Sequence, residues 1–266
     1  MKKIVFLWQR IGKIMNNKLQ WGYMLNLWNK YQKKIPVLLE FYSYPHALIS
    51  GKSGSGKSTS MLFLIGKLLQ MNAEIVLYIL DFKNSDDFQF MNEYRYFFRG
   101  NNCIEGLREY YQSFIETREK GVNDKIHLLI FDEYPSCLSY FSLQDKLNKT
   151  KVSSEMQGIV SELLMLGRGL KYGVWIIVQR PDSSMFNSGS RDNFMVNLAL
   201  GSLSKEHRTM IFAGEDIDNY RIYQKGEGIL LADGYPLFYV KFPLIENIEV
   251  WKANILKKLI DKTGEP

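Results

Sequence analysis

A glycine-rich segment at residues 51–59 lies between two apolar stretches and limits the folds open to this chain. It is Gly-Lys-Ser-Gly-Ser-Gly-Lys-Ser-Thr and fits the pattern G-x-x-x-x-G-K-[ST] without a gap. Residues 46–50 are typical of a short buried strand, and residues 57–71 are typical of a buried helix. A loop in this context turns backbone N–H groups inward, and the following helix adds its positive N-terminal end. The segment therefore predicts a site for the phosphates of a nucleotide.

The residue types of this loop suit ATP and Mg²⁺. Glycines carry no Cβ, so the backbone can approach the phosphates closely. We expect Lys57 to reach the β- and γ-phosphates and the Ser58 hydroxyl to bind Mg²⁺. The predicted nucleotide-binding residues are Gly51, Ser53, Gly54, Ser55, Gly56, Lys57, Ser58 and Thr59.

An acidic pair follows a second apolar stretch. Residues 126–132 end in Asp132, and Glu133 comes next. In ATPases with a phosphate loop, this is the Walker B arrangement. We expect Asp132 to hold Mg²⁺ through water, because this cation keeps much of its hydration shell, and Glu133 to orient and polarise the attacking water. Two acids after a strand are by themselves more often a solvated turn, and the phosphate loop upstream favours the catalytic interpretation.

The sequence does not favour a GTPase. Residues 148–151, Asn-Lys-Thr-Lys, lack the aspartate of the guanine-reading N-K-x-D motif. Residues 133–135, Glu-Tyr-Pro, bring no glycine where a D-x-x-G switch requires one. The Asp-Glu pair therefore indicates hydrolysis of ATP.

Apolar runs and helical patterns alternate along residues 44–245. Continuous apolar strands of this kind are typical of a buried parallel sheet. The alternation predicts an α/β domain with a mainly parallel central sheet over residues 44–245, followed by a C-terminal helix and tail at 246–266. The further expected strands are 74–81, 126–132, 174–179, 194–200, 228–231 and 237–242, and the further expected helices are 101–120, 153–170 and 248–260.

Charge is distributed unevenly. The chain has 34 Lys and Arg against 28 Asp and Glu, a net charge of +6 over 266 residues. Residues 1–39 hold eight of the basic groups and no acid, so the remainder carries 34 − 8 = 26 basic groups against 28 acidic ones. A basic segment of this kind indicates an anionic partner, either nucleic acid or lipid headgroups.

The basic N-terminal arm, residues 1–43, has apolar residues at helical spacing in two sets, within 4–14 and 21–28. We expect helices that either pack on the body or lie as a basic amphipathic element on a membrane or on DNA. No apolar run is long enough to cross a bilayer, and residues 4–8 are too short for a signal peptide. A cytoplasmic protein is expected, with peripheral membrane contact through residues 1–35 left open.

Cysteine and histidine usage excludes several other classes of site. The two cysteines, Cys103 and Cys137, exclude a disulfide framework and most zinc ligand sets. His46, His127 and His207 are far apart in sequence and have no ligand-like spacing. A reducing compartment is therefore expected.

A glutamine ends the apolar stretch at residues 174–178. Gln179 could place its amide near the γ-phosphate and the attacking water, and so couple hydrolysis to the loop that follows. By itself, a glutamine at a strand end is usually a surface residue.

Seven segments follow one another in a particular order. They are 51–58, 80–84 (Leu-Asp-Phe-Lys-Asn), 129–133 (Leu-Ile-Phe-Asp-Glu), 166–170 (Leu-Gly-Arg-Gly-Leu), 178–182 (Val-Gln-Arg-Pro-Asp), 191–194 and 203–208. In this order they resemble the FtsK/SpoIIIE branch of the HerA–FtsK superfamily of DNA-pumping ATPases. Within that branch, the sequence is most similar to the FtsK-like transfer proteins of Gram-positive conjugative and mobilisable elements. The resemblance covers residues 44–245.

The resemblance implies a RecA-like P-loop NTPase motor that assembles as a ring, usually a hexamer, with DNA in the central pore and ATP between subunits. The family's nucleotide, metal, catalytic and sensor positions match Lys57, Ser58, Asp132, Glu133 and Gln179. Cell-division translocases carry a trans-acting arginine where this chain has Asn197. Arg168 and Arg208 match other family arginines and are the candidates to replace it.

Two polar segments are candidates for gripping the DNA backbone, which lysine, arginine and hydroxyl side chains do without reading sequence. The first is a predicted loop at 143–154 with Lys146, Lys149 and Lys151. The second is the 180–191 loop with Arg180 and Arg191. A solvated surface loop is the plainer interpretation of the first.

The expected function is an ATP-driven DNA translocase in the transfer or mobilisation of a mobile genetic element. The nearest alternative is a viral genome-packaging ATPase of the same superfamily. A third is a non-pumping adaptor, in which ATP binding holds a ring that recruits a relaxase or a secretion channel. Larger family members carry N-terminal membrane spans and a C-terminal winged helix, and neither pattern is found in these residues. The basic arm is then expected to dock on a membrane or a partner.

Overall fold

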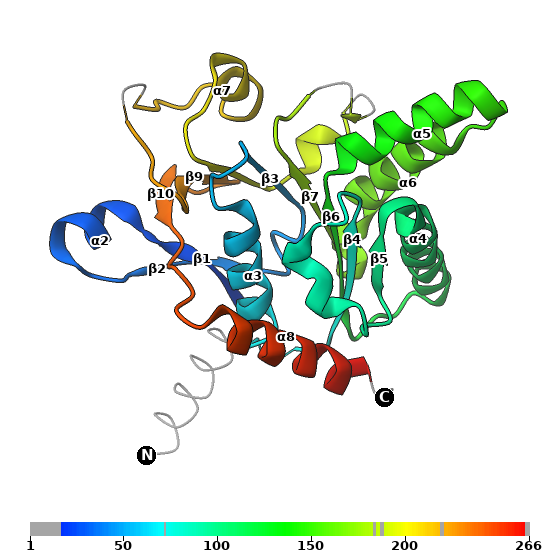
Figure 1. Ribbon diagram of the computed structural model, residues 1–266, viewed down its shortest axis with the longest axis horizontal. Helices are drawn as coiled ribbons and strands as arrows, with labels where there is room; N and C mark the ends of the chain where they lie inside the picture. The colour runs from blue at the N-terminus through cyan, green and yellow to red at the C-terminus, as the bar shows by residue number, and fades with distance from the viewer. Residues whose placement is uncertain (1–16, 72, 183–184, 187–188, 219–220, 264–266) are drawn as a thin grey trace.

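The fold is built on one mixed sheet with helices on both faces, seen in a computed structural model that describes residues 17–71, 73–182, 185–186, 189–218 and 221–263 (Figure 1). The sheet has ten strands in the order β2-β1-β10-β9-β8-β3-β7-β6-β4-β5. The strands are β1 (Lys18–Met24), β2 (Pro36–Glu40), β3 (Ala47–Gly51), β4 (Ile75–Asp81), β5 (Phe97–Arg99), β6 (Ile126–Asp132), β7 (Tyr172–Val178), β8 (Val196–Leu200), β9 (Glu227–Ala232) and β10 (Phe238–Lys241).

The helices cover the sheet and extend beyond it. The α-helices are α2 (Leu25–Tyr31), α3 (Lys57–Leu68), α4 (Cys103–Lys120), α5 (Tyr134–Asn148), α6 (Val152–Leu166), α7 (Lys205–Ile211) and α8 (Ile248–Thr263). Short 3₁₀ turns are η1 (Asp86–Met91), η2 (Gly100–Asn102), η3 (Gly167–Leu170) and η5 (Arg191–Asn193). No helix in the described part of the chain is long and apolar enough to cross a membrane.

Six neighbouring strands, β8, β3, β7, β6, β4 and β5, run parallel. Alternate side chains of these strands enter two separate cores. Ile49 and Ile177 pack on the side of α3 and α8, whereas Leu48 and Ile176 pack on the side of α4 and α6. Burial on both faces explains why these strands read as continuous apolar runs. The predicted α/β fold with a mainly parallel sheet is confirmed.

The N-terminal arm differs from its prediction over residues 18–40. A helix was expected across residues 21–28, but β1 occupies Lys18–Met24 and only then does α2 begin. Trp21 is buried and contacts Trp175, with ring centroids 5.1 Å apart. Gly22 has φ 85°, which a helix does not accept. Strand pairing and burial of Trp21 therefore override the helical spacing, and the apolar residues of 4–14 lie outside the described residues.

The expected boundary between residues 43 and 44 does not coincide with a break in the sheet. β1 pairs antiparallel with both β2 and β10, which joins the arm to strands from the far end of the chain. β9 in turn pairs antiparallel with β8. β1 and β2 thus belong to the same sheet that carries the phosphate loop.

The predicted loop at residues 143–154 is mostly helical. α5 continues to Asn148, so only residues 149–151 form a turn before α6. α5 and α6 form a hairpin that extends from the body (Figure 1). Only Tyr134 and Cys137 of α5 are buried, so the helix has no continuous apolar stripe that would have indicated it. The expected helix at 153–170 ends at Leu166 and continues as η3.

Candidate nucleotide-binding site

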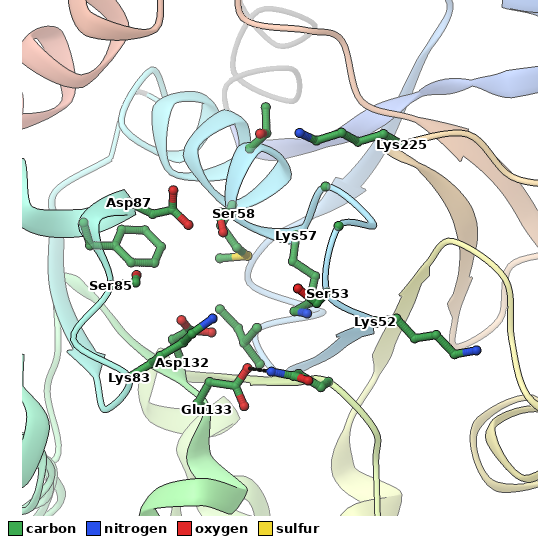
Figure 2. A pocket seen from close by; sticks show the side chains of 17 residues that line it. Lys52, Ser53, Lys57, Ser58, Lys83, Ser85, Asp87, Asp132, Glu133 and Lys225 are labelled. Atoms are coloured by element: carbon green, nitrogen blue, oxygen red, sulfur yellow. Dashed lines mark hydrogen bonds between the residues drawn. The ribbon is translucent and has the colours of Figure 1, made fainter.

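A pocket lies at the carboxyl edge of the parallel strands, where ligands bind in open α/β sheets (Figure 2). The phosphate loop, the ends of β6 and β7, the loop after β4 and the turn before β9 all contribute to its walls. The predicted residues that line it are Ser53, Gly54, Gly56, Lys57, Ser58, Thr59, Asp132, Glu133 and Gln179. The structure thus brings together residues that are far apart in sequence.

The phosphate loop reverses the chain between β3 and α3. Gly54 has φ 81° and Gly56 has φ 96°, in the region that favours glycine. Lys57 opens α3, and its Nζ donates a hydrogen bond to the Gly51 carbonyl. Burial lowers the pKa of Lys57, while the charges of Glu133 and Asp132 oppose that shift. The lysine therefore lies among carboxylates, where an anionic phosphate would give it a second partner.

Two predicted residues of the loop, Gly51 and Ser55, do not line the pocket. A Cβ on Gly51 would lie 2.8 Å from the Leu200 carbonyl oxygen, so glycine is needed for packing against β8. The Ser55 carbonyl accepts a hydrogen bond of 2.8 Å from the Gly226 N–H. These two residues fix the shape of the loop from outside the pocket.

Two carboxylates lie side by side at the ends of β4 and β6. Asp81 and Asp132 are direct register partners in the parallel pair. Burial raises the pKa of Asp132 to about 7, and the negative charges of Asp81 and Glu133 contribute to the rise. A site with these negative charges favours the binding of a cation. The Ser58 hydroxyl, a possible further ligand, lines the same pocket. The residues present therefore fit Mg²⁺.

Glu133 occupies the tight turn between β6 and α5. Its φ of 57° is left-handed, an unusual conformation for a residue with a side chain. Its N–H donates to the Ile177 carbonyl at 3.1 Å. Its Oε1 accepts a hydrogen bond of 3.0 Å from Gln179 Nε2. The acidic residue and the predicted sensor are thus in direct contact beside the phosphate loop.

Several pocket residues were not predicted. Lys83 and Asp87 come from the loop after β4 and from η1, and Lys225 comes from the turn before β9. The carboxyl end of β4 reaches the same edge as that of β6, so strand order could have indicated Lys83. Lys225 has no such signal, because long-range packing of Gly226 against Gly56 brings it there.

The candidate trans-acting arginines lie outside the pocket of their own chain. Arg168 is exposed on η3, before the amino end of β7, and so lies at the opposite edge of the sheet. Arg208 is half-buried on α7, and its Nη2 donates to the Leu203 carbonyl at 3.4 Å. Asn197 lies within β8, where its Nδ2 donates to the Phe194 carbonyl at 3.4 Å.

The candidate DNA-binding lysines lie at the outer end of the α5–α6 hairpin. Lys146 is on α5, and Lys149 and Lys151 are in the turn. The Asp145 carboxylate accepts hydrogen bonds from Thr150 Oγ1 at 2.6 Å and from the Ser153 N–H at 2.8 Å. Although partial burial opposes it, this bonding holds the pKa of Asp145 well below its usual range. These hydrogen bonds hold the backbone of the turn, which carries Lys149 and Lys151, in one conformation.

The second segment predicted to bind DNA, residues 180–191, comes shortly after the end of β7. Arg180 is exposed next to Gln179, and Arg191 begins η5, where it lies 3.8 Å from the Asp192 carboxylate. Burial lowers the pKa of His207 on α7, and the positive charges of Lys52 and Arg180 lower it further. Positive side chains therefore gather beside the phosphate loop, on the side to which Lys52 extends away from Asp132 (Figure 2).

Comparison with known proteins points to one group. No family model matches the chain. An FtsK domain-containing protein of Bacillus subtilis (strain 168), YdcQ, is 28% identical over 205 residues, which is 71% of this chain and 40% of that protein. The predicted resemblance to FtsK-type ATPases is confirmed. The chain spans about two-fifths of the length of this relative.

Solved structures share the fold at lower identity. The pCW3 conjugation coupling protein TcpA, in its monomer form with ATPγS, has a TM-score of 0.67 and 18% identity over 91% of this chain and 70% of that one. The genome packaging NTPase B204 from Sulfolobus turreted icosahedral virus 2, in complex with ATPγS, has a TM-score of 0.53 and 15% identity over 76% of this chain and 98% of that one. Both solved structures thus share the fold over most of this chain.

Proposed function

We propose that this protein is an ATP-driven DNA translocase, a ring motor that serves the transfer or mobilisation of a mobile genetic element. The observation that carries the proposal is the Glu133–Gln179 hydrogen bond of 3.0 Å in a pocket that also holds Lys57, Ser58 and Asp132. Similarity to an FtsK domain-containing protein supports the choice of a motor over other P-loop ATPases.

Each pocket residue has a role that its position supports. The loop N–H groups and Lys57 hold the phosphates, and the Ser58 hydroxyl and Asp132 hold Mg²⁺. Bound Mg²⁺ neutralises charge on the β- and γ-phosphates. Glu133 orients the attacking water and accepts its proton, which requires a carboxylate oxygen within hydrogen-bonding distance of that water.

Gln179 connects the nucleotide to the DNA-facing loop. Its amide now contacts Glu133, and the same amide can donate to a γ-phosphate oxygen. Arg180 follows it directly in sequence. Loss of the γ-phosphate would therefore change the partner of Gln179, and the change would be passed to Arg180.

A ring would supply the trans-acting arginine, which the pocket of a single chain lacks among its described residues. Neither Arg168 nor Arg208 lines the pocket of its own chain, so either arginine acts on a neighbour's nucleotide, in a ring that we propose to be hexameric. DNA passes through the pore, where Lys146, Lys149, Lys151, Arg180 and Arg191 grip phosphates without sequence preference. A relaxase or a secretion channel is the partner expected of a transfer motor.

The test is an ATPase assay with no DNA, with single strands and with duplex, at two salt concentrations. We expect DNA to stimulate hydrolysis, with weaker stimulation at high salt because phosphate contacts release counterions. Lys57→Ala and Glu133→Gln should abolish hydrolysis, while Lys120→Ala, an exposed lysine on α4, should leave it unchanged. An ATPase rate that long DNA does not alter would overturn the proposal.

The viral packaging alternative is favoured by one observation, the fold match over 98% of the B204 chain. It shares every pocket role given above and differs in the neighbouring genes, which would encode capsid proteins instead of a relaxase and an integrase. The non-pumping adaptor differs in its dependence on the basic arm. Removal of residues 1–16 tests it without cutting β1: an adaptor loses partner or membrane binding while ATP hydrolysis survives.

A further inference from the structure

The loop after β4 is held by one buried carboxylate. Asp81 is fully buried at the carboxyl end of β4. Its Oδ1 accepts a hydrogen bond from the Asn84 N–H at 3.0 Å, and its Oδ2 accepts one from the Ser85 N–H at 2.9 Å. Both carboxylate oxygens are therefore used to close the turn of residues 82–85 onto the strand that precedes it.

The backbone of this turn is also tied to the Walker B strand. The Phe82 N–H donates to the Asp132 carbonyl at 3.4 Å. Asn84 has φ 56°, the left-handed conformation that asparagine accepts better than most residues. Phe82 packs against the core that contains α4 and α6, with its ring centroid 5.8 Å from that of Tyr140. With Phe82 turned to the core, the next residue faces the pocket.

That next residue is Lys83, an exposed lysine that lines the nucleotide pocket. Its side chain extends toward Asp132 and the metal end of the pocket (Figure 2). Its charge lowers the pKa of both Asp132 and Lys57, so it lies within electrostatic range of each. Lys225 enters the same pocket from the other side, over Gly56. The two unpredicted lysines thus lie at different parts of the nucleotide.

We propose that Lys83 binds the terminal phosphate of the nucleotide and that Asp81 is a positioning residue, which fixes the turn that presents Lys83. The proposal rests on the proposed ATP site and adds a cation to it. A lysine ammonium is a compact charge that binds phosphate well. Since Lys83 extends toward Asp132, the γ-phosphate is the group that we expect it to contact.

Nucleotide affinity tests this directly, because it is measured without turnover. Fluorescent ATP and ADP analogues are titrated into wild-type protein, Lys83→Ala, Lys83→Arg and the matched control Lys120→Ala. Loss of one charge-assisted contact should weaken ATP binding by about tenfold, with ADP binding nearly unchanged. Lys83→Arg should keep most of the ATP affinity, since it keeps the charge, and Lys120→Ala should match wild type.

A double-mutant cycle separates positioning from other effects of Asp81. If Asp81 acts through Lys83, Asp81→Asn should weaken ATP binding, and Asp81→Asn in the Lys83→Ala background should weaken it no further. Independent, additive losses would overturn the positioning role. Melting temperatures of all variants show that each protein is folded.

The outcomes separate this inference from the function on which it rests. Wild-type protein that binds neither nucleotide would contradict the proposed ATP site itself. Wild-type protein that binds ATP, with Lys83→Ala binding it equally well, would overturn the role of Lys83 alone. Equal losses for ATP and ADP would overturn the assignment to the terminal phosphate.

Discussion

Gln179 donates a hydrogen bond from Nε2 to Glu133 Oε1 across 3.0 Å, and so joins the ends of β7 and β6. A second hydrogen bond joins the same two strand ends: the Glu133 N–H donates to the Ile177 carbonyl. This backbone hydrogen bond and the left-handed φ of 57° hold the main chain of Glu133 in its turn. In the proposed mechanism, rotation of the Gln179 amide would free Glu133 Oε1 for the attacking water.

Gln179→Glu should damage hydrolysis more than binding. The variant places a second carboxylate about 3 Å from Glu133, where like charges hold a proton between them and raise the pKa of the pair. We expect kcat to fall by about 10² near neutral pH and to recover as the pH rises, with ATP affinity changed less than about twofold. The check is a pH profile of kcat, with Gln179→Leu as the uncharged control. A profile identical to wild type would mean that this contact plays no part in turnover.

Gly56→Ala should weaken nucleotide binding more than Gly54→Ala. A Cβ at Gly56 would lie 2.7 Å from the Gly226 N atom, while one at Gly54 meets no atom within 4 Å. Both positions have positive φ, which costs about 1–2 kcal/mol for alanine. The collision is therefore an added effect at Gly56 only. Titration with a fluorescent ATP analogue measures it, and equal losses at the two positions would contradict the close packing of residues 224–226 on the loop.

His46 should make the protein less stable in acid. It is fully buried, its Nδ1 accepts a hydrogen bond from the Val174 N–H at 3.2 Å, and burial, with the charge of Arg168, lowers its pKa to about 3. The unfolded chain takes up this proton near pH 6.5, whereas the folded chain does not. The stability from a neutral His46 is therefore complete above about pH 6.5 and is lost as the pH falls toward 3.

The variant His46→Asn keeps an acceptor and removes this titration. Between pH 7 and pH 5, wild-type protein should lose about 2 kcal/mol more unfolding free energy than the variant. Urea denaturation at the two pH values measures the difference. His127 and His207 also have lowered pKa values, but both remain in the two proteins, so their effects cancel. Parallel pH dependences would show that His46 is not buried neutral.

Mixed rings should show which arginine acts on a neighbour. Arg168→Ala alone should lower kcat by a factor on the order of 10³, as for loss of an arginine that contacts transition-state charge. Mixing it with inactive Lys57→Ala subunits should restore activity, because some interfaces then hold both intact residues. The same test applies to Arg208→Ala. A mixture as inactive as its parts would exclude that arginine as the trans-acting one, and full activity of the single variant would do the same.

Much of the site follows from local sequence patterns. The strand predicted at 126–132 matches β6 from Ile126 to Asp132, because a buried parallel strand must be apolar throughout and ends where the acids begin. The phosphate loop lies between β3 and α3, as the apolar stretches on either side of it predict. The sequence therefore predicts the position of residues that directly follow an apolar strand.

Other parts depend on partners that are distant in sequence. The spacing of Trp21, Met24, Leu25 and Trp28 suits a helix, yet residues 18–24 pair with β2 and β10, and Leu19 and Trp21 are buried alternately as in a strand. α5 carries no apolar stripe, since only Tyr134 and Cys137 among its residues are buried. Lys225 reaches the pocket because Gly226 packs against Gly56. Such features come from tertiary contacts that no local pattern encodes.

If ATP hydrolysis moves this protein along DNA, the protein should displace streptavidin from end-biotinylated duplex. The wild-type ring should displace streptavidin when ATP is supplied, and Glu133→Gln should bind ATP and DNA without displacing it. If duplex stimulates hydrolysis but streptavidin stays in place on every length of DNA tried, the protein is not a translocase, and the non-pumping adaptor is the remaining function.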